Sequence, residues 1–121
     1  MTRRLATVRA DATLRQAAEE MCRHRVGSLL VFDGGSLLGI VTERDVLKAV
    51  GGGDAEARVE DLMTRDPETI DADEPLERAA VLMLHGGFRH LPVAEGGEIV
   101  GVLSMRDLMV VVAGDQAPRG V

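Results

Sequence analysis

Aromatic side chains are nearly absent from this chain of 121 residues. Phe32 and Phe88 are the only two, and there is no tryptophan or tyrosine. Proteins that hold single-stranded nucleic acids stack the bases on aromatic rings, and this chain offers no such platform. Positive charge is also scarce, because 20 Asp and Glu residues outnumber 14 Lys and Arg residues and leave a formal net charge of −6. Since an acidic surface repels a phosphate backbone, we predict that nucleic acids are not its partners.

Long apolar runs and secretion signals are missing as well. No apolar run approaches the roughly 20 residues that a membrane helix needs. The N-terminal sequence MTRRLATVRAD has two arginines but no apolar core after them, which is unlike a secretory signal. The single cysteine, Cys22, permits no internal disulfide and no cysteine-rich zinc site. We therefore expect a soluble cytoplasmic protein that does not enter a membrane.

Catalytic and metal-binding patterns are also lacking. The three histidines, His24, His85 and His90, are dispersed and show no zinc-ligand spacing. Cys22 lies on the apolar face of an expected helix, so we interpret it as a small core residue rather than as a nucleophile. The methionines 63, 83, 105 and 109 are interpreted as core or interface residues. We expect no metal, no required cofactor and no enzymatic activity.

What the chain does contain is an internal repeat. Thr7 aligns with Thr69, and a shift of 62 residues matches the two halves of the chain without a gap. Such self-similarity indicates two copies of one structural unit, related by an approximate two-fold axis. A half of about 60 residues is marginally stable alone, because small domains bury little surface, so we expect the apolar runs of each half to pack against the other half. The matched pairs include Ala10 and Ala72, Leu14 and Leu76, Met21 and Met83, Gly39 and Gly101, Arg44 and Arg106, and Asp45 and Asp107.

Each half predicts the same order of elements: strand, helix, strand, strand, helix. A short extended piece at residues 7–8 or 69–70 precedes an amphipathic helix, for which Asp11 or Asp73 is the expected cap. The glycines at 86 and 87 are expected to end the second of these helices. The apolar face of each helix repeats at the 3-4 spacing of one buried stripe: Leu14, Ala17, Ala18, Met21 and Cys22, then Leu76, Ala79, Ala80, Met83 and Leu84.

Two apolar runs around a glycine turn follow each helix. Asp33-Gly34-Gly35 and Glu95-Gly96-Gly97 predict hairpin turns. The last helix of each half is expected to start after Thr42 or Ser104. Residues 51–58 form an expected linker, residues 59–63 an expected short helix, and residues 114–121 an expected frayed tail.

These residues carry a resemblance to a known family. The chain resembles a tandem pair of CBS domains, also called a Bateman module, of the stand-alone type. The resemblance rests on the motifs DLMTRDPETI, RHLPV and EGGEIVG, and on a corner of the form G-h-h-[ST]-x-x-D that ends both hairpins, where h is apolar. It implies an α+β fold, a mixed α/β sandwich, in which two pseudo-two-fold-related β-α-β-β-α repeats pack through their sheets. The domains expected are residues 1–55 for the first repeat with the linker, 56–114 for the second repeat, and 115–121 for a flexible tail.

The corners, TERD at residues 42–45 and SMRD at 104–107, allow two interpretations. A Ser or Thr followed three residues later by an acid is a capping box, which needs no ligand. The same geometry suits a ligand, because a helix N-terminus attracts phosphate and a carboxylate can accept hydrogen bonds from both hydroxyls of a ribose. Arg44 and Arg106 stand beside the acids and could neutralise a phosphate.

The resemblance implies a regulatory module that binds adenosine-containing molecules in clefts between the repeats. It gives Asp45 and Asp107 the role of ribose binding, and it places the acid of one repeat with the strand starts of the other. Asp107 and Ser104 would then share a cleft with Ala6, Thr7, Val26, Gly27 and Ser28. Asp45 and Thr42 would share the other with Glu68, Thr69, Phe88 and Arg89. The residues expected at phosphate are Thr42, Ser104, Arg44, Arg106, Arg89 and His90.

The main hypothesis is therefore a non-enzymatic sensor of adenosine nucleotides such as AMP, ADP or ATP. The resemblance also implies a homodimer and a regulated enzyme or transporter that acts as a separate partner. The alternative is a structural or protein-interaction module without a ligand, in which the corners are only helix caps. The two clefts differ, since Arg89 and His90 of the second repeat replace Gly27 and Ser28 of the first. The ligand, the occupied cleft and the regulated partner stay open at this point.

Overall fold

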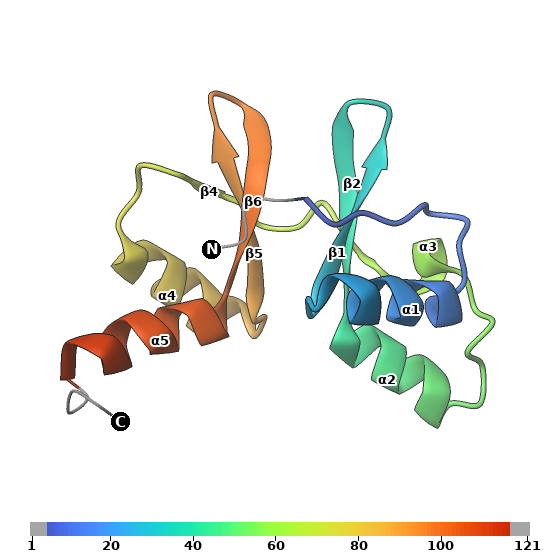
Figure 1. Ribbon diagram of the computed structural model, residues 1–121. Helices are drawn as coiled ribbons and strands as arrows, with labels where there is room; N and C mark the ends of the chain where they lie inside the picture. The colour runs from blue at the N-terminus through green and yellow to red at the C-terminus, as the bar shows by residue number, and fades with distance from the viewer. Residues whose placement is uncertain (1–4, 117–121) are drawn as a thin grey trace. The chain divides into compact units, whose positions relative to one another are not determined.

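The computed structural model describes residues 5–116, with side chains as far as Val110. The chain divides into two compact units, one spanning Leu5–Pro67 and the other beginning at Glu68. Both units have the same plan, a hairpin with two helices against one face (Figure 1). The mixed α+β class expected from the sequence is confirmed.

The first unit is built around a three-stranded sheet. Its elements are α1 (Leu14–His24), β1 (Ser28–Asp33), β2 (Ser36–Thr42), α2 (Glu43–Gly51), α3 (Val59–Leu62) and β3 (Thr64–Arg65). The strand order is β1-β2-β3, and both pairings are antiparallel. The segment before α1 adds one parallel bridge, from Thr7 to Leu30. The buried core under α1 and α2 consists of Leu14, Ala17, Met21, Leu29, Val31, Val41, Ala49, Val59 and Met63.

The second unit repeats this plan with β4 (Ile70–Asp71), α4 (Leu76–Gly86), β5 (His90–Glu95), β6 (Glu98–Ser104) and α5 (Met105–Gln116). Its sheet has the order β4-β5-β6, with β4 parallel to β5 and β6 antiparallel to it. Its buried core consists of Ile70, Ala79, Met83, Leu91, Val93 and Leu103. The helix α5 extends to Gln116 and so includes the first three residues of the expected tail, whereas residues 117–121 lie outside the described part.

The two hairpins have the same register, 62 residues apart. Ser28 pairs with Thr42 at the open end of the first hairpin, and His90 pairs with Ser104 at the open end of the second. Each hairpin carries a bulge at the matching place, after Val31 and after Val93. The turns fall where the glycines predict them. Gly96 and Gly97 have φ angles of 60° and 84°, a region that side chains with a Cβ rarely adopt.

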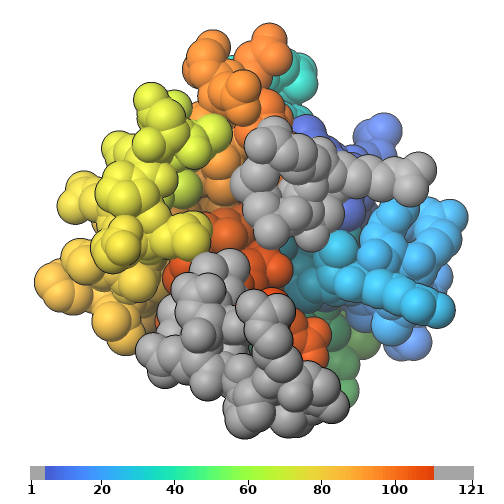
Figure 2. Space-filling view, turned by 60° about the vertical axis from the view of Figure 1, so that its left-hand side comes forward, coloured from blue at the N-terminus to red at the C-terminus, as the bar shows by residue number. Residues whose placement is uncertain are grey.

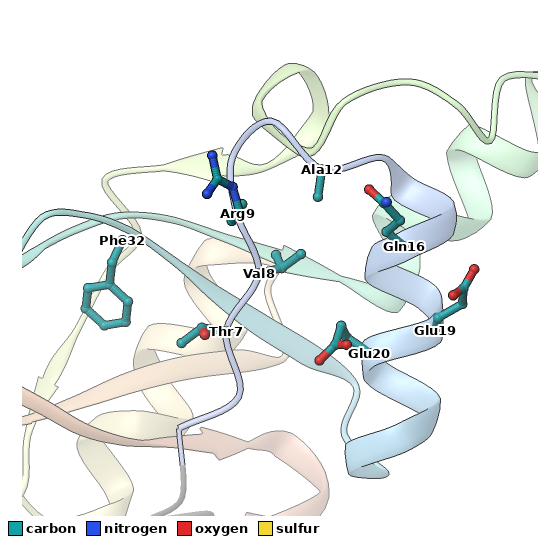
Figure 3. A pocket seen from close by; sticks show the side chains of 8 residues that line it. All are labelled: Thr7, Val8, Arg9, Ala12, Gln16, Glu19, Glu20 and Phe32. Atoms are coloured by element: carbon teal, nitrogen blue, oxygen red, sulfur yellow. The ribbon is translucent and has the colours of Figure 1, made fainter.

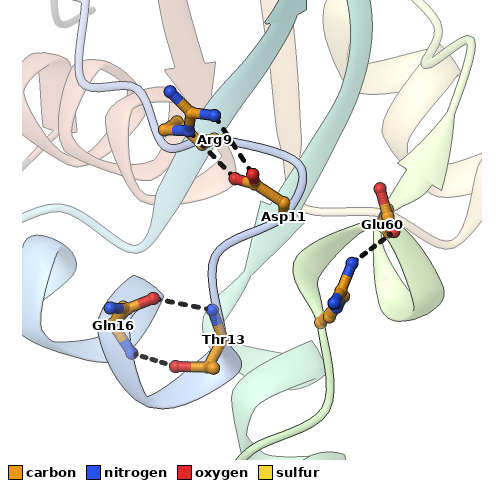
Figure 4. Close-up of polar contacts among 6 residues, drawn as sticks. Arg9, Asp11, Thr13, Gln16 and Glu60 are labelled. Atoms are coloured by element: carbon orange, nitrogen blue, oxygen red, sulfur yellow. Dashed lines mark hydrogen bonds and ion pairs between the residues drawn. The ribbon is translucent and has the colours of Figure 1, made fainter.

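The N-caps of α1 and α4 differ from the expectation, whereas the C-cap of α4 agrees with it. Thr13, and not Asp11, is the N-cap of α1: its hydroxyl accepts from the Gln16 amide, and the Gln16 side chain accepts from the Thr13 amide (Figure 4). Asp11 bonds Arg9 instead, and this hydrogen bond lowers the pKa of Asp11. Likewise Pro75, and not Asp73, precedes α4. The helix α4 ends at Gly86, and its C-cap Gly87 is left-handed, as predicted.

The expected linker is part of the first unit rather than a free tether. The amides of Leu14 and Arg15, at the start of α1, donate to the carbonyls of Ala57 and Ala55, at 2.9 and 3.0 Å. In return, the amide of Val59 donates to the carbonyl of Ala12 at 2.8 Å. The predicted short helix forms as α3 and places Val59 in the core. The strand β3 was not expected, because two residues give no periodic signal.

The interpretation of Cys22 as a core residue is wrong, because its side chain is exposed. The buried stripe of α1 runs through Leu14, Ala17 and Met21, and Cys22 lies about 100° further round the helix than Met21. Leu84, its equivalent on α4, is exposed for the same reason. On α1 the stripe that hydropathy suggested was too wide by Cys22, and on α4 it was wrong at both ends, because Leu76 and Leu84 are exposed.

Gly39 lies where β3 approaches β2 closely. A Cβ on Gly39 would lie 2.7 Å from the Thr64 carbonyl oxygen and 2.8 Å from the sulfur of Met63. We expect Gly39→Ala to lower the free energy of unfolding by about 1–3 kcal/mol, because one strand must move away. Gly35→Ala is the control, since its Cβ would meet nothing within 4 Å, and it should change stability by less than about 0.5 kcal/mol. Equal urea midpoints for the two variants would contradict this account.

Candidate functional site

The two hydroxyl-x-x-Asp motifs lie where a hairpin ends and the second helix of the same repeat begins. Thr42 ends β2 and α2 begins at the next residue, while Ser104 ends β6 and α5 begins at the next residue. In each unit the carboxylate three residues on turns back to this junction. We call the two places the Thr42 corner (Thr42, Glu43, Arg44, Asp45) and the Ser104 corner (Ser104, Met105, Arg106, Asp107).

The Thr42 corner is held by one carboxylate oxygen. Oδ2 of Asp45 accepts from the backbone amide of Thr42 at 2.8 Å and from the Thr42 hydroxyl at 3.2 Å. The second oxygen, Oδ1, has no hydrogen-bond partner in the described part of the chain. Since a carboxylate oxygen accepts up to two hydrogen bonds, Asp45 is fixed in place by one oxygen and can present the other to a ligand.

The Ser104 corner is a complete capping box. Oδ2 of Asp107 accepts from the Ser104 amide at 2.9 Å, and the Ser104 hydroxyl accepts from the Asp107 amide at 3.1 Å. The capping-box interpretation of the motif is therefore correct as local structure. The capping box is present at the Thr42 corner as well. The corners differ because the Thr42 hydroxyl also donates its proton to Asp45, whereas Ser104 makes no such donation to another described residue. The hydroxyl proton of Ser104 is thus available to a ligand oxygen.

Each corner is joined to the strand start of its own repeat. The Glu43 amide donates to the Gly27 carbonyl at 3.0 Å, and Ser28, which is buried, pairs with Thr42. In the second unit the Met105 amide donates to the Arg89 carbonyl at 2.8 Å, and His90 pairs with Ser104. The structure therefore brings Gly27 and Ser28 to the Thr42 corner, and Arg89 and His90 to the Ser104 corner. The expected sharing of residues between repeats stays a prediction.

Three arginines near the corners present free charge. Arg44, Arg89 and Arg106 are exposed, and none forms an ion pair within the described residues. His90 is half-buried and has an interaction partner. A helix N-terminus next to unpaired guanidinium groups favours an anion. The Thr42 corner also carries Glu43, so its local charge is the more negative of the two.

The other predicted residues lie on the segments that precede or follow the first helices. The carbonyl of Ala6 accepts from the Leu30 amide at 2.9 Å, which aligns the segment before α1 with β1. Glu68 and Thr69 are exposed just before β4, and Val26 is half-buried before β1. The Phe88 ring packs over Gly86, where a Cβ would lie 2.0 Å from the ring. Phe88 is thus held by its own repeat.

Sequence reasoning missed one open pocket in the first unit. It has a volume of about 610 Å³ and lies between the segment before α1 and α1 itself (Figure 3). Of the predicted site residues only Thr7 borders it, and neither corner does. No motif could have shown it, because its wall is a helix face that reads as ordinary solvated surface. The lining residues are Thr7, Val8, Arg9, Ala12, Gln16, Glu19, Glu20 and Phe32.

Among the described residues, no group of three or more His, Cys, Asp and Glu side chains could hold a metal ion. In the same part of the chain, no helix is both long and apolar enough to cross a bilayer.

Comparison with protein families decides the relationship. The model of the CBS domain matches residues 1–52 and again residues 59–114. The chain belongs to the CBS-domain family. The two matches coincide with the two halves of the internal repeat, so the chain is a tandem CBS pair, as the motifs indicated.

Curated relatives match most of the chain. The CBS domain-containing protein YhcV of Bacillus subtilis is 32% identical over 112 residues, which are 91% of this chain and 80% of YhcV. An uncharacterized 17.7 kDa protein of Acidianus ambivalens is 39% identical over 109 residues. Those residues are 88% of this chain and only 66% of that protein, so about a third of the Acidianus protein has no counterpart here.

Solved CBS structures match the fold over nearly the whole chain. The CBS domain protein PAE2072 of Pyrobaculum aerophilum, in complex with AMP, has a TM-score of 0.81, 29% identity and coverage of 97% of this chain and 95% of that one. The CBS pair of protein MJ0100, in complex with 5′-methylthioadenosine and S-adenosyl-L-methionine, has a TM-score of 0.83, 25% identity and coverage of 94% and 93%. A hexameric CBS-CP12 protein from bloom-forming cyanobacteria has a TM-score of 0.84, 26% identity and coverage of 99% and 73%.

The capping role of the Ser104 corner can be measured without a ligand. We expect Ser104→Ala to lower the free energy of unfolding by about 0.5–2 kcal/mol, because the Asp107 amide loses its acceptor. Arg106→Ala is the neighbouring control, since an exposed and unpaired side chain contributes little. Urea unfolding of the two variants gives the comparison. A Ser104→Ala variant as stable as the wild type would mean that the hydroxyl does not cap α5.

Proposed function

We propose that this CBS pair is a regulatory module that binds an adenosine-containing nucleotide, such as AMP, ADP or ATP, and that it is not an enzyme. The observation that carries the proposal is the orientation of the corner carboxylates. Each is anchored through Oδ2 on a backbone amide, and Asp45 keeps Oδ1 without a partner among the described residues. An oriented carboxylate is suited to accept hydrogen bonds from ribose hydroxyls, because no further side-chain ordering is needed when the ligand arrives.

Relatives support the ligand class. Protein PAE2072 binds AMP, and the CBS pair of MJ0100 binds 5′-methylthioadenosine and S-adenosyl-L-methionine. All three ligands share the adenosine unit and differ in the group at the 5′ position. We propose that Asp45 and Asp107 bind the ribose in the clefts between repeats that the family resemblance implies. We assign the 5′ group to Thr42, Ser104 and the nearby cations.

Regulation follows from a change in population. A ligand shifts a protein between two arrangements only by its difference in affinity for them. We propose that the module works as a homodimer in the cytoplasm, and that a separate enzyme or transporter responds to the shift. Within this proposal the adenosine nucleotide is a ligand, and the module requires no resident cofactor.

A thermal-shift panel tests the proposal. Wild-type protein is heated with AMP, ADP, ATP, S-adenosylmethionine and adenosine, with GMP and GTP as controls. A ligand present at about 100 times its dissociation constant adds about 2.7 kcal/mol of stability, which raises the Tm of a domain of this size by several degrees. We expect adenosine compounds alone to raise the Tm. A flat panel would favour the alternative, a ligand-free interaction module with the corners as caps only.

The acids are tested by substitution. We expect the double variant Asp45→Ala/Asp107→Ala to lose the ligand-dependent rise in Tm while it keeps a cooperative unfolding transition. Asp54→Ala/Asp73→Ala removes the same charge from two exposed acids, one in each repeat, and should keep the full response. Isothermal titration provides the affinities. Unchanged affinity in Asp45→Ala/Asp107→Ala would sink the assignment of ribose binding to these carboxylates.

A further inference from the structure

The pocket of the first unit opens where the segment before α1 leaves the sheet. Thr7 forms the single bridge from this segment to β1, and the amide of Val8 donates to the Leu30 carbonyl at 3.0 Å. Beyond this point the segment is bonded to α3 instead, because the Ala10 carbonyl accepts from the Glu60 amide at 2.9 Å. The pocket of about 610 Å³ lies in the space between the segment and α1 (Figure 3).

The second repeat keeps the equivalent segment on its sheet. Its strand β4 pairs with β5 at two positions, and the Ala72 amide then donates to the Ala94 carbonyl at 2.7 Å. The equivalent bond of the first repeat, from Ala10 to Phe32, is not made within the described part of the chain. The side chain of Phe32 lines the resulting gap and is only half-buried. An aromatic ring is thus accessible from the pocket.

The wall that α1 contributes carries two carboxylates. Gln16, Glu19 and Glu20 line the pocket and share one face of the helix, because Gln16 lies three and four residues before the two acids. Glu19 is exposed, and it forms no ion pair or hydrogen bond within the described residues. The side chain of Glu20 is 27% exposed and reaches from α1 toward the segment (Figure 3). Figure 2 shows α1, in light blue, uncovered at the right of the view.

The nearby cations leave the lining negative. Arg9 lines the pocket, but its guanidinium donates to both carboxylate oxygens of Asp11, at 2.9 and 3.1 Å. Glu20 pairs with Arg23, which lies outside the lining and is 70% exposed, and its Oε2 is 3.2 Å from Nε2 of His24. So exposed an ion pair is weak, and a carboxylate can accept about four hydrogen bonds. Glu20 can therefore accept from a ligand as well.

The internal repeat shows that the acids and the ring are not required by the fold. A shift of 62 residues leads to the second repeat, which has apolar side chains at all three positions: Val81 for Glu19, Leu82 for Glu20 and Ala94 for Phe32. Both repeats nevertheless form a hairpin covered by two helices. Carboxylates beside an accessible ring in one repeat alone are thus better explained by recognition than by packing.

We propose that this pocket binds a small organic cation, an aliphatic amine or guanidine, as a ligand separate from the nucleotide. Its N–H groups would donate to the carboxylates of Glu19 and Glu20, in charge-assisted hydrogen bonds. The Phe32 ring attracts a cation held over its face, and Val8 contacts the carbon chain. The volume is within the range of small-molecule sites. Of the residues predicted for the nucleotide only Thr7 borders the pocket.

An NMR titration of the isotope-labelled full chain tests the proposal. The probe is agmatine, in which a short carbon chain joins a guanidinium to an ammonium, and putrescine is the corresponding diamine. We expect both probes to cause saturable shifts of the amide signals of Val8, Glu20 and Phe32. Butanediol is the control ligand, because it has the carbon chain of putrescine without the charges, and it should shift none of these signals.

Two variants test the lining. Glu20→Gln keeps the shape of the side chain and removes its charge, so agmatine should bind about ten times more weakly. Phe32→Ala introduces the residue that the second repeat has at this position, and it should weaken binding about two- to fivefold. The control, Glu77→Gln/Glu98→Gln, removes two exposed carboxylates of the second repeat. It should retain the wild-type affinity for agmatine, and all variants should unfold cooperatively.

The outcomes decide between a site and general attraction to an acidic chain. A titration without saturation, shifts spread over the acidic surface, or an equal loss of affinity in the control variant would each overturn the proposal. N-acetylarginine amide presents its guanidinium from a peptide backbone. If it binds more tightly than agmatine, the occupant is an arginine of a partner protein, and the small-molecule assignment is wrong. The thermal-shift panel scores nucleotides separately, so either ligand can fail without the other.

Discussion

One hydrogen bond, made twice, organises this protein. In each repeat an aspartate oxygen accepts from the backbone amide of the hydroxyl residue that ends a hairpin, at 2.8 Å in one repeat and 2.9 Å in the other. The bond fixes the direction in which the second helix leaves the sheet. A second bond, from the first helical amide to the carbonyl before the hairpin, ties that helix to the other strand. Strand end, helix start and strand start therefore meet at one place, where the chemically distinctive side chains are also found.

The same bond explains why a cap and a binding site need not be alternatives. A carboxylate that swings freely would lose entropy on binding a ribose, whereas one already held by its backbone does not. Capping therefore prepares the acid for a ligand rather than competing with it. The two corners differ in the hydrogen bond left for a ligand. The Thr42 hydroxyl donates its proton to Asp45, whereas the Ser104 hydroxyl only accepts, from the Asp107 amide, among the described residues.

Much of the fold could be predicted because both halves of the chain carry the same sequence pattern. Glycine pairs predicted both turns, and hydroxyl-x-x-Asp predicted both helix starts, since each signal is local. Three features escaped prediction because they depend on packing. Thr13 displaced Asp11 as a cap, Cys22 turned outward, and β3 formed from two residues that Gly39 admits against β2. In the candidate site, each corner lies beside the strand start of its own repeat, because one hairpin connects the two. Contacts between residues from different repeats depend on a geometry that local patterns do not encode.

The hydrogen bonds between residues 55–59 and the start of α1 bear on how such a chain can evolve. A connection that closes the N-terminus of a helix cannot be lengthened without exposing amides that it now satisfies. Extra sequence inserted there would disturb the first repeat and not merely separate it from the second. The hairpin tips are less constrained: a Cβ added at Gly35, in the first tip, would meet nothing within 4 Å. Insertions and fused segments are therefore best accommodated at the tips, far along the strands from the corners.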